Sequence, residues 1–166
     1  MFLLCVFEPL WQIGLEARMK KILIINGPNL NLLGEREPEI YGFLTLEDIT
    51  NKIKEYIKNK DIEVKFFQSN HEGQIIDFIH EHRKWADGIL INPAALTHYS
   101  YSLRDAISGV MLPTVEVHLS DISKRETFRQ NSVIKDVCIQ QVSGLGLGSY
   151  LKGLDILLTK LLQISI

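Results

Sequence analysis

Residues 22–42 read ILIINGPNLNLLGEREPEIYG, and this stretch decides the class of the fold. Its first four residues, Ile22 to Ile25, form an uninterrupted apolar run, which is typical of a buried parallel strand. A polar loop that contains asparagine, arginine and tyrosine follows the strand directly. Because ligands of open α/β sheets bind where the strands end, we expect a functional site at this loop.

Three side chains of the loop are candidates for catalysis or binding. Tyr41 is a candidate base, although tyrosine is a poor base at its ordinary pKa of about 10. The guanidinium of Arg36 is a candidate activator, because a neighbouring positive charge lowers a tyrosine pKa. Asn29 offers an amide able to bind a neutral oxygen. The alternative interpretation is a mobile polar loop without function.

The rest of the chain alternates between strand and helix patterns. Helices are predicted over Leu46 to Ile57, after Ser69 or Asn70 as N-cap, over Tyr99 to Val110, briefly over Arg125 to Arg129, and over the leucines 151–162. Further strands are predicted over Ile62 to Gln68, Gly88 to Ile91, Thr114 to Val117, and Val137 to Val142. This regular alternation predicts a single α/β domain: a flavodoxin-like, doubly wound, five-stranded parallel sheet.

Composition bounds the function. The 166 residues carry a net charge of −2, so nothing suggests a nucleic-acid partner. Cys5 and Cys138 are the only cysteines, which excludes a disulfide framework or a zinc-ligand spacing built from cysteine. We therefore expect a protein of the reducing cytoplasm. The apolar run from Met1 to Phe7 is too short to span a membrane.

The first 18 residues differ from the rest. Met19-Lys20-Lys21 opens directly into the first strand, so either Met19 is the natural start or residues 1–18 are an extension outside the fold. A short helix that covers a hydrophobic surface is the alternative. The predicted division is therefore an extension over residues 1–18 and one catalytic domain over residues 19–166.

Two further strand ends carry candidate catalytic and binding groups. Asn92 and His98 follow the third strand, and the fourth strand ends in Glu116-Val117-His118. Since side chains repeat every two residues along a strand, Glu116 and His118 face the same side. A carboxylate beside an imidazole fixes its tautomer and favours its protonated form, which is suited to a general acid. A purely structural Glu–His pair is the alternative.

Two other motifs are interpreted as structural. The glycine-rich run Gly144 to Gly148 follows the last strand and has Ser149 in place of a third fingerprint glycine, so packing of the last helix explains it better than nucleotide binding. His80 and His82 do not share a helix face and so do not form a metal site by spacing.

Taken together, these segments resemble the type II 3-dehydroquinate dehydratases. The matching strings are Asn26-Gly27-Pro28-Asn29-Leu30, Gly34-Glu35-Arg36-Glu37-Pro38, Tyr41-Gly42, Asn92-Pro93, Thr97-His98, Leu103-Arg104-Asp105, Glu116-Val117-His118-Leu119-Ser120, Arg125 and Phe128-Arg129. Their order and spacing agree from about Lys20 to the C-terminus. The resemblance implies removal of water from 3-dehydroquinate through an enolate, by anti elimination, in the shikimate pathway, without a metal or organic cofactor.

The resemblance also implies catalytic roles. Tyr41 would accept the C2 proton, Arg36 would activate it and stabilise the transition state, and His118 would protonate the departing hydroxyl. Glu116 would orient His118, and Asn29 would help to hold a water molecule against the enolate oxygen.

The remaining roles that the resemblance implies concern binding and assembly. Asn92, His98 and Arg129 would bind polar groups of the substrate, and the backbone amides of Leu119 and Ser120 would receive its carboxylate. Asp105 would reach the site of a neighbouring subunit, because the family assembles as trimers grouped into a dodecamer.

One residue departs from the family pattern, and it bears on the wall of the site. Ala94 stands where the family usually has glycine after Asn-Pro, so its methyl group is expected to crowd the loop or to force an unusual backbone angle.

Rival functions fit the sequence less well. A type I dehydratase needs a larger barrel, for which this chain is too short. It also needs a Schiff-base lysine, and no lysine stands at the matched strand ends. A non-enzymatic receiver or flavin-binding module of flavodoxin-like fold would want acidic residues or a Ser/Thr-rich loop where Asn26, Pro28 and Asn29 stand.

Overall fold

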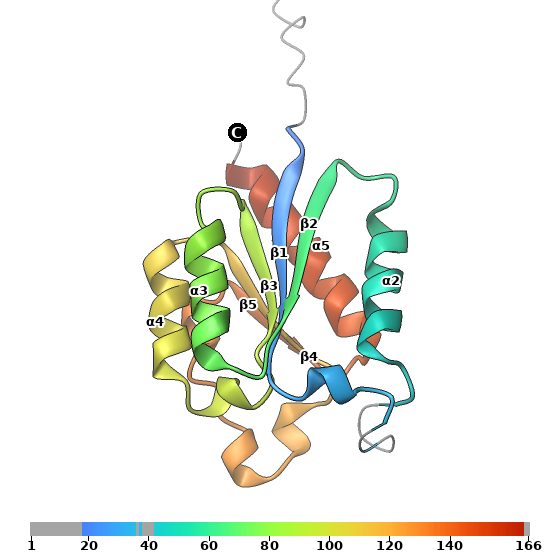
Figure 1. Ribbon diagram of the computed structural model, residues 1–166, viewed down its shortest axis with the longest axis vertical. Coiled ribbons are helices and arrows are strands. Elements are labelled where there is room, and N and C mark those ends of the chain that lie inside the picture. Colours follow the sequence, from blue (N-terminus) through green and yellow to red (C-terminus); the bar gives the residue numbers. More distant parts are fainter. Residues whose placement is uncertain (1–17, 36, 38–41, 165–166) are drawn as a thin grey trace, which may run out of the picture.

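The computed structural model describes residues 18–35, 37 and 42–164, and in them five parallel strands form one sheet in the order β2-β1-β3-β4-β5 (Figure 1). The strands are β1 (Lys20–Asn26), β2 (Ile62–Gln68), β3 (Gly88–Asn92), β4 (Thr114–His118) and β5 (Gln140–Ser143). This order is that of the flavodoxin-like fold, which confirms the predicted fold class.

Helices cover both faces of the sheet (Figure 1). The elements are α2 (Leu46–Ile57), α3 (Glu72–His82), α4 (Tyr101–Val110) and α5 (Leu147–Ile164), together with short 3-10 helices η2 (Leu30–Leu32), η3 (Ala94–His98), η4 (Ile122–Lys124), η5 (Thr127–Arg129) and η6 (Lys135–Val137). One apolar layer joins α2 and α5 to the sheet, and a second joins α3 and α4 to its other face. The sheet is therefore doubly wound, as predicted.

The strand order reverses at β1, and this places the functional edge. Strand β1 lies between β2 and β3, and the last residue of β1, Asn26, is paired in register with the last residue of β3, Asn92. Because the connections leave these two strands in opposite directions, a crevice opens outside their carboxyl ends.

Local signals set several element boundaries. A capping box begins α2, with the side chain of Thr45 and the side chain of Asp48 each bonded to the other's backbone N–H. The prediction of Ser69 or Asn70 as N-cap of α3 is wrong, since His71 holds that position. Ser69 instead donates to Gln74 and accepts from the His71 backbone N–H, which builds the turn before the helix.

The buried stripe of helix α5 coincides only in part with the leucines 151–162 over which this helix was predicted. Tyr150, Leu154, Leu157 and Leu161 are buried at a spacing of four, three and four residues, whereas Leu162 is exposed. Leu151, Leu158 and Leu162 flank the buried stripe, so the leucines alone do not mark the buried face of this helix. Close packing on the sheet requires Gly153, where a Cβ atom would lie 2.6 Å from Cγ1 of Val117.

The last strand and the glycine-rich run also differ in detail from expectation. Strand β5 starts at Gln140 rather than at Val137, because residues 135–137 form η6. Gly144 and Gly146 have positive φ angles of 81° and 56° and form the turn into α5. They do not line the main cavity, which agrees with the structural interpretation of the run.

The predicted extension over residues 1–18 lies almost wholly outside the described residues. Of it, only Arg18 is described, and its guanidinium is 3.3 Å from Asp87 in an exposed ion pair. The division at residue 18 therefore stays a prediction. Within the part of the chain that the structure describes, no helix has the length and apolar character needed to cross a membrane.

Candidate active site

A cavity of about 110 Å³ opens at the carboxyl ends of β1, β3 and β4. Since one water molecule occupies roughly 10–15 Å³ on this measure, the cavity has room for a small organic molecule. Of the predicted site residues, the following line it: Asn29, Asn92, His98, His118, Leu119, Ser120 and Arg129. Segments far apart in the sequence therefore meet at the edge where the sequence predicted a site.

Four predicted residues stand apart from this lining. Arg36 and Tyr41 lie outside the described residues, so their predicted roles stay predictions. Glu116 is fully buried behind His118 rather than in the wall. Asp105 is exposed on α4 and does not line the cavity of its own chain.

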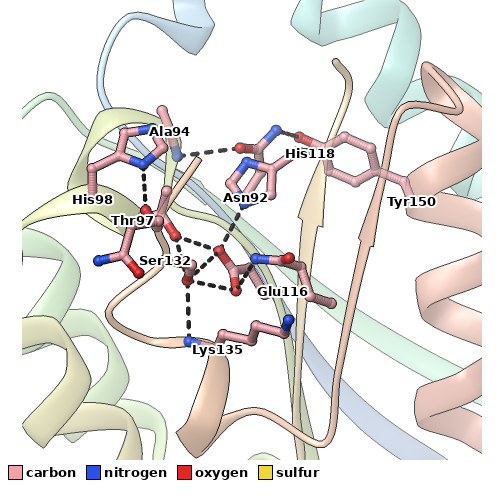
Figure 2. Close-up of polar contacts among 11 residues, drawn as sticks. Asn92, Ala94, Thr97, His98, Glu116, His118, Ser132, Lys135 and Tyr150 are labelled. Carbon is pink, nitrogen blue, oxygen red and sulfur yellow. Dashed lines mark hydrogen bonds and ion pairs between the residues drawn. The ribbon is translucent and has the colours of Figure 1, made fainter. Parts of the chain in front are cut away.

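The centre of the site is the pair formed by Glu116 and His118. Both side chains are buried at the end of β4 and point to the same face, as the strand alternation predicted. The carboxylate Oε1 of Glu116 accepts a hydrogen bond from Nε2 of His118 at 2.7 Å (Figure 2). This bond leaves Nδ1 of the imidazole for chemistry in the cavity, because His118 lines it.

Three more side chains hold Glu116 in place (Figure 2). Oγ1 of Thr97 donates to Oε1, and Nε2 of Gln141 donates to Oε2 at 2.8 Å. Oγ of Ser132 lies 3.0 Å from both oxygens. Burial would raise the pKa of Glu116, but the hydrogen bonds from His118, Thr97 and Gln141 and the nearby His118 lower it below its ordinary value. Glu116 is therefore an anion at neutral pH.

His98 faces the cavity from η3. Its Nδ1 donates to the backbone carbonyl of Asn131 at 2.8 Å, so Nε2 is the nitrogen available to a ligand. Burial lowers the pKa of His98; the bond to Asn131 opposes the shift, while His118 and Arg129 add to it. His98 thus enters the site as a neutral imidazole near pH 7.

A cationic wall lies beside His98, on η5 and the segment before it, and the ring of Phe128 contacts that of His98 with their centroids 6.5 Å apart. Arg129 stacks on the ring of Phe128, with its guanidinium carbon 4.9 Å from the ring centroid. Its Nε is buried and 3.3 Å from Oε2 of Glu126, but without the alignment of a hydrogen bond. Arg125 also lines the cavity, with Nη1 3.4 Å from Oγ of Ser120. Two guanidiniums at the rim favour an anionic ligand.

The floor of the cavity contains asparagine amides. Nδ2 of Asn92 donates to the hydroxyl of Tyr150 at 2.9 Å, and that hydroxyl donates to Oδ1 of Asn26 at 2.6 Å. Asn29 has a left-handed backbone (φ 64°), and its N–H donates to Oδ1 of Asn70 at 2.8 Å. The ends of β1, β2 and β3 are thereby tied together under the cavity.

The expectation for Ala94 is confirmed in its backbone. Its φ of 52° lies in the left-handed region that favours glycine. The backbone N–H of Ala94 donates to Oδ1 of Asn92 at 3.2 Å, which stabilises this conformation. Ala94 also lines the cavity, so the strained residue lies in the wall itself.

Sequence reasoning missed the residues that support the predicted ones. Gln141 lies opposite Glu116 in the pairing of β4 with β5, so a correct register for β5 would have found it. Ser132 lies in a loop, and Tyr150 is on the apolar face of α5, where an aromatic residue is expected to be core. Arg125 was part of a matching string, but it received no role.

Other candidate reactive groups do not form sites. Among the described residues, no group of three or more His, Cys, Asp or Glu side chains is placed to hold a metal ion. His82 is occupied in a hydrogen bond to the Phe78 carbonyl and in ring contacts with Phe78 and Trp85. Burial raises the pKa of the Cys138 thiol, so this thiol stays protonated and unreactive.

Comparisons with known proteins agree with this geometry. Residues 20–158 match the family model described as dehydroquinase class II. The chain is 56% identical over 137 residues to a 3-dehydroquinate dehydratase of Halothermothrix orenii, covering 82% of this chain and 93% of that protein. A relative of the same name from Dictyoglomus turgidum is also 56% identical over 137 residues, covering 82% of this chain and 94% of that protein.

Solved structures give the same result. The crystal structure of a type II dehydroquinase from Butyrivibrio crossotus superposes with a TM-score of 0.81 at 52% identity, covering 83% of this chain and 97% of that one. A type II dehydroquinase from Propionibacterium acnes gives a TM-score of 0.81 at 38% identity, covering 86% and 98%.

Proposed function

The chain belongs to the class II dehydroquinase family, and we propose that it is a 3-dehydroquinate dehydratase, a hydro-lyase of the shikimate pathway that leads to chorismate and the aromatic amino acids. The observation that carries the proposal is the buried His118–Glu116 pair at the edge of a cavity with an arginine-lined rim. The substrate carries a carboxylate and a hydroxyl leaving group, which match the rim and the pair.

The reaction needs a base, a place for the enolate charge and an acid. Tyr41, activated by Arg36, takes the proton from C2, next to the ketone. The electrons of that C–H bond move toward the ketone oxygen and form the enolate. Asn29 holds the water molecule that stabilises this oxygen, and the exposed position of Asn29 in the cavity wall supports this role.

The second half of the reaction expels the hydroxyl from the neighbouring carbon. The enolate reforms the ketone, a carbon–carbon double bond forms, and the hydroxyl departs with a proton from His118 as water. The ionised Glu116 at 2.7 Å stabilises the imidazolium and fixes the ring. Before the next turnover Tyr41 releases the proton that it took from C2, and His118 takes one up, so no net proton is gained or lost.

Binding groups surround the reacting atoms. Asn92 and His98 bind substrate hydroxyl or ketone oxygens, and the guanidinium of Arg129 adds a charged donor. The backbone amides of Leu119 and Ser120 receive the carboxylate. This assignment is supported by the cavity lining, in which all five residues take part.

The assembly belongs to the same proposal. Asp105 is exposed on α4, away from its own cavity, which is the placement expected of a residue that serves a neighbouring subunit. We infer trimers grouped into a homododecamer. The setting is the cytoplasm, with neither nucleic acid nor membrane as partner.

The direct test is to add 3-dehydroquinate to the purified protein and follow ultraviolet absorbance. The conjugated enone product absorbs where the substrate does not. We expect absorbance to rise with wild-type protein and to stay nearly flat with His118→Asn. Absence of product with the wild type would overturn the proposal, and a yellow protein would favour the alternative of a flavin-binding module.

A further inference from the structure

A chain of three buried polar side chains lies under the floor of the cavity. Asn26 ends β1, Asn92 ends β3, and Tyr150 projects from α5 between them (Figure 2 shows Asn92 and Tyr150). Tyr150 is fully buried, and both asparagines are 3% exposed. A polar group at such depth is costly unless each atom is hydrogen-bonded, so the arrangement is tightly constrained.

The hydrogen bonds that link Asn92, Tyr150 and Asn26 run in one fixed direction. A tyrosine hydroxyl has one proton, and here it accepts from Nδ2 of Asn92 at 2.9 Å and donates to Oδ1 of Asn26 at 2.6 Å. Burial raises the pKa of Tyr150, which outweighs the opposing hydrogen bond from Asn92. The hydroxyl therefore stays a neutral donor over the working pH range and cannot be the base of the reaction.

This direction determines how the carboxamide of Asn92 lies. Its nitrogen faces Tyr150 and its oxygen accepts from the N–H of Ala94 at 3.2 Å. A 180° flip would set the amide nitrogen against the Ala94 N–H and lose that hydrogen bond. One N–H of the amide remains uncommitted, and Asn92 lines the cavity.

The same chain supports the backbone that carries His98. Ala94 is the first residue of η3, and its left-handed φ of 52° is unfavourable for a residue with a Cβ atom. The bond to Asn92 holds it there. Since η3 ends at His98, a change at Ala94 would move the second binding residue of the wall.

We propose that Tyr150, which the family resemblance assigns no role, is a positioning residue of the active site. Its hydroxyl locks the Asn92 carboxamide with an N–H presented to a polar group of the substrate and, through Asn92, holds the Ala94 turn that places His98. Tyr150 acts through Asn92 and does not itself line the cavity. The inference rests on the proposed dehydratase function.

Tyr150→Phe removes the hydroxyl alone, and Tyr56→Phe is its matched control. The hydroxyl of Tyr56, on α2, donates to Asp155, which lies on the same helix as Tyr150, and neither Tyr56 nor Asp155 lines the cavity. We expect Tyr150→Phe to raise KM for 3-dehydroquinate at least about fivefold, with kcat within about twofold, because the lost contact is one of substrate binding. Tyr56→Phe should leave both constants unchanged.

Two further measurements separate positioning from mere stability. The pH limits of kcat should not move in Tyr150→Phe, since the Glu116–His118 pair is untouched. Asn26→Leu removes the acceptor of the Tyr150 hydroxyl and leaves the Tyr150 ring in the core. We expect KM to rise in this variant too. Circular dichroism and thermal melting establish that each variant is folded.

The outcomes decide the proposal. Folded Tyr150→Phe and Asn26→Leu proteins with KM within about twofold of wild type would overturn it, as would failure of both variants to fold, which would make the chain structural. If the wild type and Tyr56→Phe are themselves inactive, the proposed function has failed rather than this inference.

Discussion

Replacement of Glu116 by glutamine is the most informative change to the catalytic pair. The side chain is fully buried, and its two oxygens are bonded to His118, Thr97, Ser132 and Gln141. Glutamine keeps the shape and removes the charge. A hydrogen bond to a charged group contributes about 1.5–3 kcal/mol, roughly twice that of a neutral one.

The distance of 2.7 Å between His118 and Glu116 is that of a charge-assisted hydrogen bond, so this energy range applies to the pair. The charge-assisted bond is strongest when the imidazole is protonated, which is the state that gives its proton to the leaving group. Loss of about 1.5–3 kcal/mol of that stabilisation corresponds to a fall in kcat of roughly 10- to 150-fold at 1.36 kcal/mol per tenfold change. The basic limb of the pH profile should also move to lower pH, because the protonated imidazole loses its anionic neighbour.

The variant is expected to fold. Gln141 can rotate its amide to accept from the new glutamine N–H, so the free energy of unfolding should fall by only about 1–3 kcal/mol. The assay is the initial rate of enone formation across pH, with thermal melting in parallel. Glu55→Gln, which removes an exposed carboxylate 3.3 Å from Lys52 on α2, is the control and should change neither kcat nor the profile.

The refuting result is specific. A folded Glu116→Gln enzyme with kcat within about threefold of wild type and an unshifted basic limb would mean that Glu116 is a structural anion.

Four more predictions concern neighbouring features. Because the pKa of Glu116 is held below its ordinary 4.5, the contribution of the carboxylate to stability is fully present above pH 4.5 and is lost as pH falls through the lower, folded-state value. In urea denaturation below pH 4.5, the free energy of unfolding should therefore fall more steeply for wild type than for Glu116→Gln. Ala94→Gly should relieve the positive φ of 52° and raise the free energy of unfolding by about 1 kcal/mol, seen as a higher Tm; an unchanged or lower Tm would show that methyl packing outweighs the strain. Arg36→Ala should lower kcat at least roughly tenfold and move the acidic limb upward, with Arg36→Lys recovering part of the rate; an unshifted limb with near-normal kcat would make Arg36 a loop residue only. Light scattering should find a dodecamer whose dissociation abolishes activity, and a fully active monomer would contradict the role given to Asp105.

Much of the fold could be predicted because its signals are local. The apolar runs of β1 and β3 are bounded by asparagine, glycine and proline, and their ends agree with the structure to within a residue at the cavity edge. Strand alternation alone placed Glu116 and His118 on one face. Such short-range rules hold wherever the strand is fully buried and its register is unambiguous.

The supporting shell could not be predicted because it is made by long-range packing. Tyr150 lies 124 residues from Asn26 and 58 from Asn92, and its hydroxyl meets them only after α5 has docked on the sheet. Gln141 depends on the register of β5, whose start the sequence prediction placed too early. Neither side chain leaves a periodic signal that distinguishes it from core or surface.

The switch point of the sheet explains why these supports gather under the cavity. Beyond the last residue pair of β1 and β3, one more backbone hydrogen bond joins the two segments. The N–H of Gly27 donates to the carbonyl of Asn92 at 2.8 Å. A Cβ atom on Gly27 would lie 2.3 Å from the carbonyl oxygen of Pro93, so the two chain ends touch backbone to backbone. The buried amides of Asn26 and Asn92 then complete the junction through Tyr150. The same junction thus joins the ends of β1 and β3 and fixes the cavity floor. A side chain at position 27 should therefore disturb both the strand ends and the floor.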